Sequence, residues 1–139
     1  VAEHDAARSV RQLASAGAGR NYLEKTRISW SDGPHGQGPT GRALRKRATI
    51  VWRDTDADVD YAPWRETAAE YGFVGSVAIP VAVGDERLAV LNIYSADSGA
   101  FGREELELLG HLAGSLGCRL RAHEAARAGL QNGVTSGAL

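Results

Sequence analysis

The most constraining feature of this chain is a pair of apolar runs joined by a tight turn. The first covers residues 74–83 (V-G-S-V-A-I-P-V-A-V), the second covers residues 87–94 (R-L-A-V-L-N-I-Y), and Gly84-Asp85 stands between them. Two β-prone runs separated by a short Gly/Asp turn are typical of an antiparallel hairpin in the middle of a sheet. Because proline has no amide donor, Pro80 predicts a bulge or an unpaired strand edge at that point.

Helical signals flank this hairpin on both sides. Residues 39–46 follow a glycine-rich loop, and residues 62–70 carry a proline in their first turn with Gly72 just beyond their end. After the hairpin, leucines and alanines recur at helical spacing from Phe101 to about Ala126, which predicts one long helix with an apolar stripe. Because helices mix with an antiparallel strand pair, the expected fold class is α+β.

Shorter segments complete the expected order of elements. They comprise strands over residues 1–4, 9–16 and 49–52, a helical turn over residues 21–26 and an irregular acidic stretch over residues 54–60. In the helical turn, Tyr22 and Leu23 are the candidates for burial. Residues 129–139 are expected to form a flexible C-terminal tail, so the chain is predicted to be one domain over residues 1–128.

Composition and charge exclude several classes of function. The chain has 139 residues, of which 43% are hydrophobic and 24% are charged, and its formal net charge is -1. Nearly neutral chains bind nucleic acid and anionic membranes poorly, so neither is an expected partner. No apolar run approaches the roughly 20 residues that cross a bilayer, and no signal peptide is evident. The single cysteine suits a reducing compartment, and the expected location is cytoplasmic.

A glycine-rich loop opens directly into the first helix at residues 36–45 (G-Q-G-P-T-G-R-A-L-R). Proline in the first helical turn sacrifices no hydrogen bond, and the Thr40 hydroxyl is expected to cap free backbone donors. The junction would then gather unpaired N–H groups and the positive end of a helix dipole, which favour an anionic or polar ligand. The alternative is an ordinary loop-to-helix junction without a ligand.

The residues capable of acid–base, metal or thiol chemistry form no catalytic pattern. None of the four histidines has a second histidine three or four positions away, so no metal site is predicted. Cys118 falls on the long helix and is expected to contact a partner helix or to have no role. Gly110, Gly114 and Gly117 each cost a helix about 1 kcal/mol relative to alanine. This cost favours close packing of a neighbouring helix, with compositional drift as the alternative.

Five sequence blocks together resemble a GAF domain over about residues 9–121. They are G-Q-G-P-T-G-R-A-L-R, A-P-W-R-E-T-A-A-E-Y-G, S-V-A-I-P-V, L-A-V-L-N-I-Y-S-A-D and A-F-G-R-E-E-L-E-L-L. The closest resemblance is to GAF modules of bacterial signalling proteins with histidine kinase, diguanylate cyclase or cyclic-di-GMP phosphodiesterase domains. It implies a central antiparallel sheet flanked by helices, a small-ligand pocket on one side and often a homodimer. A typical member starts with a helix and a complete first strand ahead of the Val1 region, so this chain is expected to lack that helix and to expose a strand edge.

The resemblance places the pocket between the sheet and the segment from the glycine loop to the helix at Pro63. The expected lining combines aromatic walls with a few polar groups, as small-molecule sites require. It consists of Trp30, Thr40, Trp52, Asp54, Trp64, Arg65, Tyr71, Ser76, Ala78, Asn92 and Tyr94. The alternative for Trp52, Trp64 and Tyr94 is a purely structural place in the core. Asn92 interrupts an apolar strand and needs a hydrogen-bond partner. Arg65 would hold a ligand carboxylate or phosphate, or else pair with Asp56, Asp58 or Asp60.

The leading functional hypothesis is a non-catalytic sensory module. A small molecule of unknown identity would shift the packing of the helices, and the long helix would pass the change to an output domain. This receptor hypothesis requires a cavity where the loop beside Pro39 meets the hairpin. The alternatives are a dimerisation module whose pocket is filled by its own side chains, and an enzyme similar to free methionine sulfoxide reductases. Those enzymes rely on several cysteines, whereas this chain has one.

Cyclic nucleotides are not an expected ligand. Phe101 with Glu104 and Glu105 loosely resembles the acidic signature of GAF domains that bind them. The basic residue that this signature also needs is absent beside Asn92, where Ile93 stands. The sequence names no cofactor.

Overall fold

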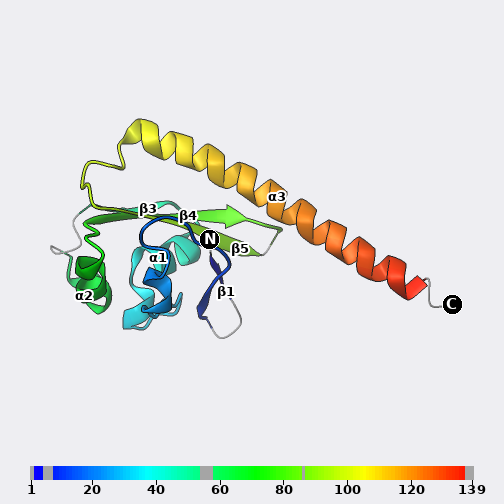
Figure 1. The fold of residues 1–139 in the computed structure, drawn as a ribbon, viewed down its shortest axis with the longest axis horizontal. Coiled ribbons are helices and arrows are strands. Elements are labelled where there is room, and N and C mark those ends of the chain that lie inside the picture. Colours follow the sequence, from blue (N-terminus) through cyan, green and yellow to red (C-terminus); the bar gives the residue numbers. More distant parts are fainter. Residues whose placement is uncertain (1, 5–7, 54–57, 86, 137–139) are drawn as a thin grey trace.

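A central antiparallel sheet organises the fold. The computed structural model describes residues 2–4, 8–53, 58–85 and 87–136. In the described chain the sheet has the strand order β2–β1–β5–β4–β3 (Figure 1). The strands are β1 (Ala2–His4), β2 (Val10–Gln12), β3 (Ile50–Trp52), β4 (Gly75–Ala82) and β5 (Leu88–Ser95). The α+β class is therefore confirmed, whereas the strand predicted over residues 9–16 is formed only by Val10–Gln12.

The predicted hairpin is the centre of the sheet. β4 and β5 pair from Gly75 opposite Ser95 to Ala82 opposite Leu88 without interruption. Pro80 keeps its place opposite Val90, so the predicted bulge is wrong. On its other side, β4 pairs with β3 only as far as Ala78. Pro80 therefore lies where that edge of β4 has no strand partner among the described residues. This confirms the other predicted possibility, an unpaired strand edge at Pro80.

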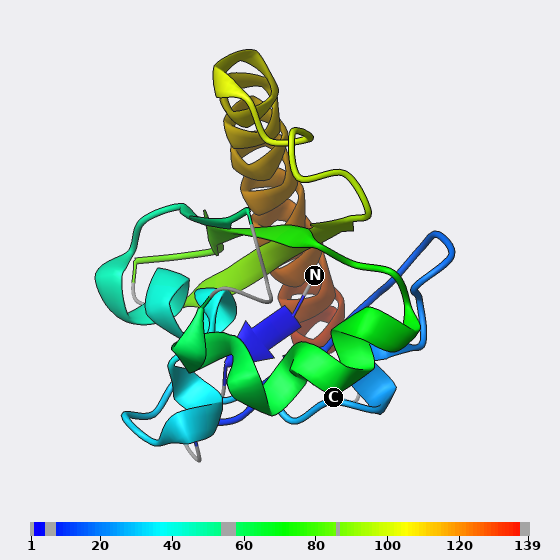
Figure 2. The same ribbon diagram turned by 90° about the vertical axis from the view of Figure 1, so that its left-hand side faces the viewer.

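The two faces of the sheet carry different cores. Side chains alternate along a strand, and the odd-numbered residues of β4 and β5 pack with the long helix α3 (Arg103–Ser136) on one face. The even-numbered residues face α1 (Pro39–Lys46) and α2 (Ala62–Glu70), as seen for Ala78 and Val90 beside Leu44 of α1. Figures 1 and 2 show α3 on one side of the sheet and the two shorter helices on the other. Ser76, Asn92 and Tyr94 are also even-numbered and therefore lie on this second face. The candidate site is on this face.

Short helical elements support the α1–α2 layer. Both helices have the predicted bounds, and Gly72, with φ +69, follows the end of α2 in the left-handed conformation that glycine favours. Three 3₁₀ turns connect the layer: η1 (Tyr22–Glu24), η2 (Pro34–Gly36) and η3 (Val59–Tyr61). The predicted helical turn over residues 21–26 corresponds to η1, in which Tyr22 is buried.

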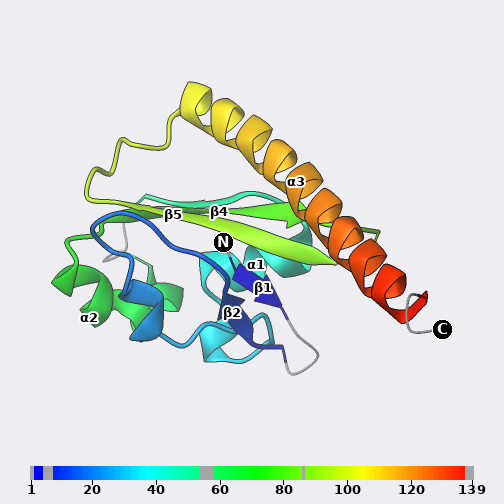
Figure 3. The same cartoon turned by 45° about the vertical axis from the view of Figure 1, so that its right-hand side comes forward.

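The long helix α3 differs from expectation in its length. It continues to Ser136, so the helix extends through the range 129–136, beyond its predicted end near Ala126. This stretch lacks proline, which would stop a helix. Figure 3 shows the second half of α3 running past the sheet toward the C-terminus. No helix of the described chain has the length and apolarity needed to span a membrane.

The glycines of α3 also differ from expectation. A Cβ at Gly117 would stand 2.5 Å from the main-chain oxygen of Ala82, so the close neighbour is strand β4 and not a second helix. At Gly110 and Gly114 a Cβ would meet no atom within 4 Å. Close packing therefore explains one of the three glycines, and nothing in the structure explains the other two.

Candidate functional site

A cluster of aromatic rings fills the space between the sheet and the α1–α2 layer. Tyr22 of η1, Tyr61 of η3 and Trp64 of α2 are 1%, 2% and 4% exposed. The Tyr22 ring lies 4.7 Å from the ring of Tyr94 on β5, and the Tyr22 and Tyr61 hydroxyl oxygens are 3.3 Å apart. Edge and tilted ring pairs of this kind stabilise a core beyond simple area burial. The cluster is therefore a packed aromatic layer with hydroxyl groups inside it.

The space enclosed by this layer is very small. A cavity of about 10 Å³ lies among eight residues: Tyr22, Ile28, Gly38, Pro39, Thr40, Tyr61, Trp64 and Tyr94. That volume is close to the minimum for one water molecule. The structure thus closes the place where the receptor hypothesis requires room, and a ligand would enter it only if a ring moved.

Trp64 is the residue that closes the cavity over the start of α1. A Cβ at Gly38 would stand 2.8 Å from the Trp64 ring, so only glycine fits beneath it. The Trp64 indole Nε1 donates to the main-chain oxygen of Arg27 at 2.9 Å, which fixes the ring. Since the ring covers the helix start, the structure offers no open position there for the expected anionic ligand.

Thr40 does not cap its own helix as predicted. The N-cap of α1 is Gly38, and no side chain hydrogen-bonds to the helix start. Thr40 is 3% exposed because it faces the sheet, and its Oγ1 donates to Asn92 Oδ1 of β5 at 3.0 Å. The hydroxyl therefore links α1 to the centre of the sheet.

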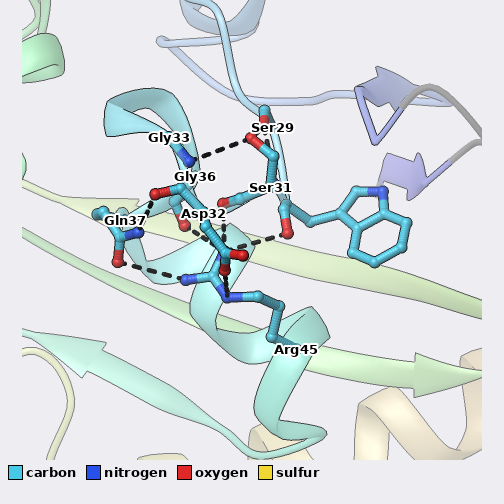
Figure 4. A network of polar contacts seen from close by, with 8 residues as sticks. Ser29, Ser31, Asp32, Gly33, Gly36, Gln37 and Arg45 are labelled. Carbon is cyan, nitrogen blue, oxygen red and sulfur yellow. Dashed lines mark hydrogen bonds and ion pairs between the residues drawn. The ribbon is translucent and has the colours of Figure 1, made fainter.

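Arg45 of α1 points into the glycine-rich loop and donates hydrogen bonds to its main chain (Figure 4). Its Nη1 donates to the main-chain oxygens of Trp30 at 3.1 Å and of Ser31 and Gly36 at 2.7 Å. Figure 4 shows the guanidinium surrounded by this loop, with Asp32 beside it. The Arg45 Nε lies 4.0 Å from Asp32 Oδ1. The loop thus turns carbonyl oxygens toward a cation of its own chain, and this arrangement opposes the predicted anion site.

Asn92 stands between the closed layer and an open cavity. Its Nδ2 is buried and has no hydrogen-bond partner among the described residues, although its Oδ1 accepts from Thr40. A cavity of about 350 Å³ lies beside β5, lined by residues of both strand parities and of the segment that leads into η1: Ala14, Ser15, Ala16, Gly19, Arg20, Leu23, Leu91, Asn92 and Tyr94. Tyr94 borders both spaces. Asn92 thus lines the cavity while its amide donor is buried beside it without a partner among the described residues, and this is the clearest unmet hydrogen-bonding requirement in the site.

The tyrosine hydroxyls are kept neutral. Burial is the main cause that raises the pKa of Tyr22, Tyr61 and Tyr94 above the ordinary value of 10.0. For Tyr61, the hydrogen bond with the Tyr22 hydroxyl opposes this rise in pKa without reversing it. Charged side chains are absent from the lining of the small cavity. The site therefore offers neutral hydrogen-bonding groups and aromatic faces, and the described residues contain no cluster arranged to hold a metal ion.

The structure gathers most, but not all, of the predicted site residues. Seven of them lie on the α1–α2 side of the sheet: Thr40, Trp52, Trp64, Ser76, Ala78, Asn92 and Tyr94. Tyr71 belongs to the rim, with its ring 5.6 Å from that of Tyr22. Trp30 packs against the core cluster of α1, under the guanidinium of Arg8, and lines neither cavity. Asp54 lies outside the described residues.

Arg65 is also placed differently from the prediction. Its Nη2 donates to the main-chain oxygen of Asp58 at 2.9 Å, and Arg65 lines neither of the two cavities. Sequence reasoning missed Tyr22 and Tyr61 as site residues. Tyr22 was expected to be buried, but Tyr61 ends an acidic stretch and gave no signal except its aromatic ring.

Comparison with solved structures agrees with this fold. The chain is similar to a domain from Sinorhizobium meliloti described as part of a two-component sensor histidine kinase, with a TM-score of 0.69 and 16% identity over 91% of this chain and 80% of that one. It is similar to the GAF domain region of a Geobacter sulfurreducens membrane protein, with a TM-score of 0.56 and 24% identity over 65% and 60%.

A third similar structure is an enzyme. It is the free methionine-R-sulfoxide reductase of Neisseria meningitidis in complex with its substrate, with a TM-score of 0.64 and 24% identity over 90% of this chain and 67% of that one. At these identities the likeness establishes the fold alone. No curated protein matches the chain. The family described as GAF domain matches residues 1–118, which is most of the sequence. The chain therefore belongs to the GAF domain family.

Proposed function

We propose that this chain is a non-catalytic sensory module that binds a small molecule against the wall formed by Asn92 and Tyr94. The observation that carries the proposal is Asn92, which lines the cavity of about 350 Å³ and whose buried Nδ2 has no hydrogen-bond partner among the described residues. A buried donor without a partner costs about 1–3 kcal/mol. A ligand acceptor atom placed opposite it would recover that free energy.

The lining defines the chemistry of the proposed ligand. Leu23 and Leu91 offer apolar surface, Tyr94 offers a ring face, and Arg20 adds a positive charge to the lining. These groups suit a small molecule with an apolar or aromatic body, a carbonyl-type acceptor toward Asn92 and a polar or acidic group toward Arg20.

The same asparagine supplies a route to the helices. Its Oδ1 is tied to Thr40 of α1, and the neighbouring residues Leu91 and Ile93 of β5 pack on the other face with the core under α3. Occupation of the cavity would therefore bias the packing of both layers, and α3 would pass the change to an output domain of a longer protein in the cytoplasm.

The absence of catalysis is part of this proposal. Cys118, the one cysteine of the sequence, is exposed on α3, on the face of the sheet opposite to Asn92. A thiol on that face does not reach a ligand in the cavity. The buried tyrosines are protonated near neutral pH, as an ordinary tyrosine is, and burial raises their pKa values further. They therefore serve as hydrogen-bonding groups and not as nucleophiles.

The test combines native mass spectrometry with thermal unfolding. The protein purified from its host should carry a small molecule, or the small-molecule extract of that host should raise the Tm by mass action. The Asn92→Leu variant should fold but lose the shift in Tm, while Asn21→Leu, at an exposed asparagine outside the cavity, should keep it. If no host extract raises the Tm of the wild-type protein, the receptor proposal is refuted.

The closed inner layer favours a second candidate, an interaction module without a ligand. Tyr22, Tyr61 and Trp64 leave only about 10 Å³ at the place where the family resemblance puts the pocket. In that case the domain would act through its surface, and the expected homodimer would be its function. Association that is identical in wild type and Asn92→Leu, together with an unresponsive Tm, would favour this candidate.

A further inference from the structure

The edge of β4 borders a second open cavity, separate from the one beside Asn92. The cavity measures about 460 Å³, a volume typical of small-molecule sites, and it shares no lining residue with the Asn92 cavity. It lies where β4 extends past Ala78, the last residue of β4 that pairs with β3. Its walls come from three parts of the fold: the turn after α1, the end of β4 and one face of α3.

The α3 wall of this cavity lacks side chains at two positions. Gly110 and Gly114 both line the cavity, and a Cβ at either would meet no atom within 4 Å. Glycine weakens a helix relative to alanine, and packing within the described chain does not require it at these two positions. The two glycines keep the cavity open, because a larger side chain at either position would extend into it.

The charged groups that line the cavity are both cationic. Arg47 follows the end of α1 and Arg121 stands on α3, whereas no aspartate or glutamate lines the cavity. The Arg121 Nε donates to the main-chain oxygen of Val83 at 3.2 Å, which positions its guanidinium at the end of β4. Neither arginine has a carboxylate partner among the described residues. Two guanidinium groups without an acidic partner favour an anionic ligand, because each presents several N–H donors.

We propose that this cavity binds a small organic anion at Arg47 and Arg121. The carboxylate or phosphate group of the ligand would accept hydrogen bonds from the two guanidinium groups, and its apolar part would lie against Pro80 and Ala82 of β4. The ligand would bridge the turn after α1 and the long helix, so its binding would hold α3 against this edge of the sheet. The site would thus act on α3 separately from the ligand proposed for the Asn92 cavity.

Pro80 favours a small molecule over an added peptide strand as the occupant. A peptide that extended the sheet along this edge would need main-chain donors from β4. Pro80 lines the cavity and has no amide donor, so the ladder would be broken at that residue. A small anion needs only the two arginine side chains and no main-chain ladder.

The thiol of Cys118 reports whether the cavity is occupied. Cys118 is exposed, lines the cavity and is the one cysteine of the sequence, so N-ethylmaleimide modifies a single thiol. Phenyl phosphate and benzoate serve as probes, and phenol and inorganic phosphate are controls that each lack one half of the ligand chemistry. If a probe binds with a Kd of about 1 mM, about 10 mM of it should slow the modification about tenfold. Both controls should protect less, and about 0.5 M salt should reduce the protection by the probes. The probe that protects at the lower concentration shows whether the site prefers a phosphate or a carboxylate.

Removal of single charges tests the two arginines. Arg47→Gln and Arg121→Gln should each raise the Kd of the probes by about tenfold, because each removes a charged hydrogen-bond donor. Arg119→Gln is the matched control, since Arg119 is exposed beside Cys118 on α3 but does not line the cavity. Gly114→Leu should leave the protein folded and abolish the protection, because its side chain enters open space. Equal protection in Arg47→Gln, Arg121→Gln and Arg119→Gln, or an unprotected wild type at about 10 mM of either probe, would overturn the proposal.

Discussion

Two glycines of α3 provide a sharp test of how closely this helix approaches the sheet. Gly114 and Gly117 are less than one helical turn apart, and both lie in the helix interior. A Cβ at Gly114 would meet no atom within 4 Å. A Cβ at Gly117 would stand 2.5 Å from the Ala82 main-chain oxygen and 3.3 Å from Val81 Cγ1. The same substitution, glycine to alanine, should therefore have opposite effects at the two positions.

The magnitudes follow from helix propensity and from overpacking. Gly114→Ala should raise the free energy of unfolding by about 1 kcal/mol, the usual advantage of alanine over glycine in a helix. Gly117→Ala has the same advantage, but its new methyl group meets the backbone of β4, which is held by pairing to β5 on one side. Overpacking against a rigid neighbour costs about 1–3 kcal/mol. The propensity gain cancels in the comparison, so Gly117→Ala should be less stable than Gly114→Ala by about 1–3 kcal/mol.

Urea unfolding at constant temperature measures this difference. The midpoint should rise for Gly114→Ala and stay level or fall for Gly117→Ala, with the same dependence on denaturant in both variants. Two variants of equal stability would show that α3 can move away from Ala82 at no cost. The packing of α3 against β4 would then not fix the position of the helix.

Two further predictions concern the site. Because burial raises the pKa values of Tyr22, Tyr61 and Tyr94 above 10.0, the unfolded chain loses their protons first. Stability should be fully present below pH 10 and should fall as the pH rises above it, because the unfolded chain then releases protons that the folded chain keeps. Urea unfolding from about pH 9 to about pH 11 would contradict this reasoning if it found a constant stability. Arg45→Met leaves three loop carbonyls without their shared donor and should lower stability by about 2–3 kcal/mol. Lys46→Met, at the exposed neighbouring residue, should change it by less than about 0.5 kcal/mol, and equal losses would refute a special role for Arg45.

The elements that sequence reasoning located well are those set by local rules. The bounds of α1 and α2 follow from proline in the first turn and from Gly72 after α2. The hairpin of β4 and β5 follows from two apolar runs and a short turn, and it needs no distant residue. The end of α3 was misplaced because the apolar stripe stops at Leu120, whereas a helix without a stop signal continues to Ser136.

The candidate site was harder to predict because it depends on side-chain direction. The family resemblance grouped Asn92 with Tyr94 in one pocket lining, but it could not show that Trp64 covers the start of α1 over Gly38. Thr40 was expected to cap the start of its own helix. The tertiary structure shows instead that its hydroxyl donates a hydrogen bond to Asn92 of the neighbouring sheet. Arg45 lacked any signal in the sequence, because its partners are main-chain oxygens of a loop.

By itself, the order of residues determined the antiparallel α+β architecture and the family, since turn residues, helix ends and apolar spacing act over short distances along the chain. Only the tertiary structure decided which groups are left for a ligand. The packed rings of Tyr22, Tyr61 and Trp64 fill the expected pocket, and the Asn92 Nδ2 has no partner among the described residues although Asn92 lines a larger cavity. Whether a polar group is satisfied depends on neighbours brought together from distant parts of the chain, so no local pattern determines it.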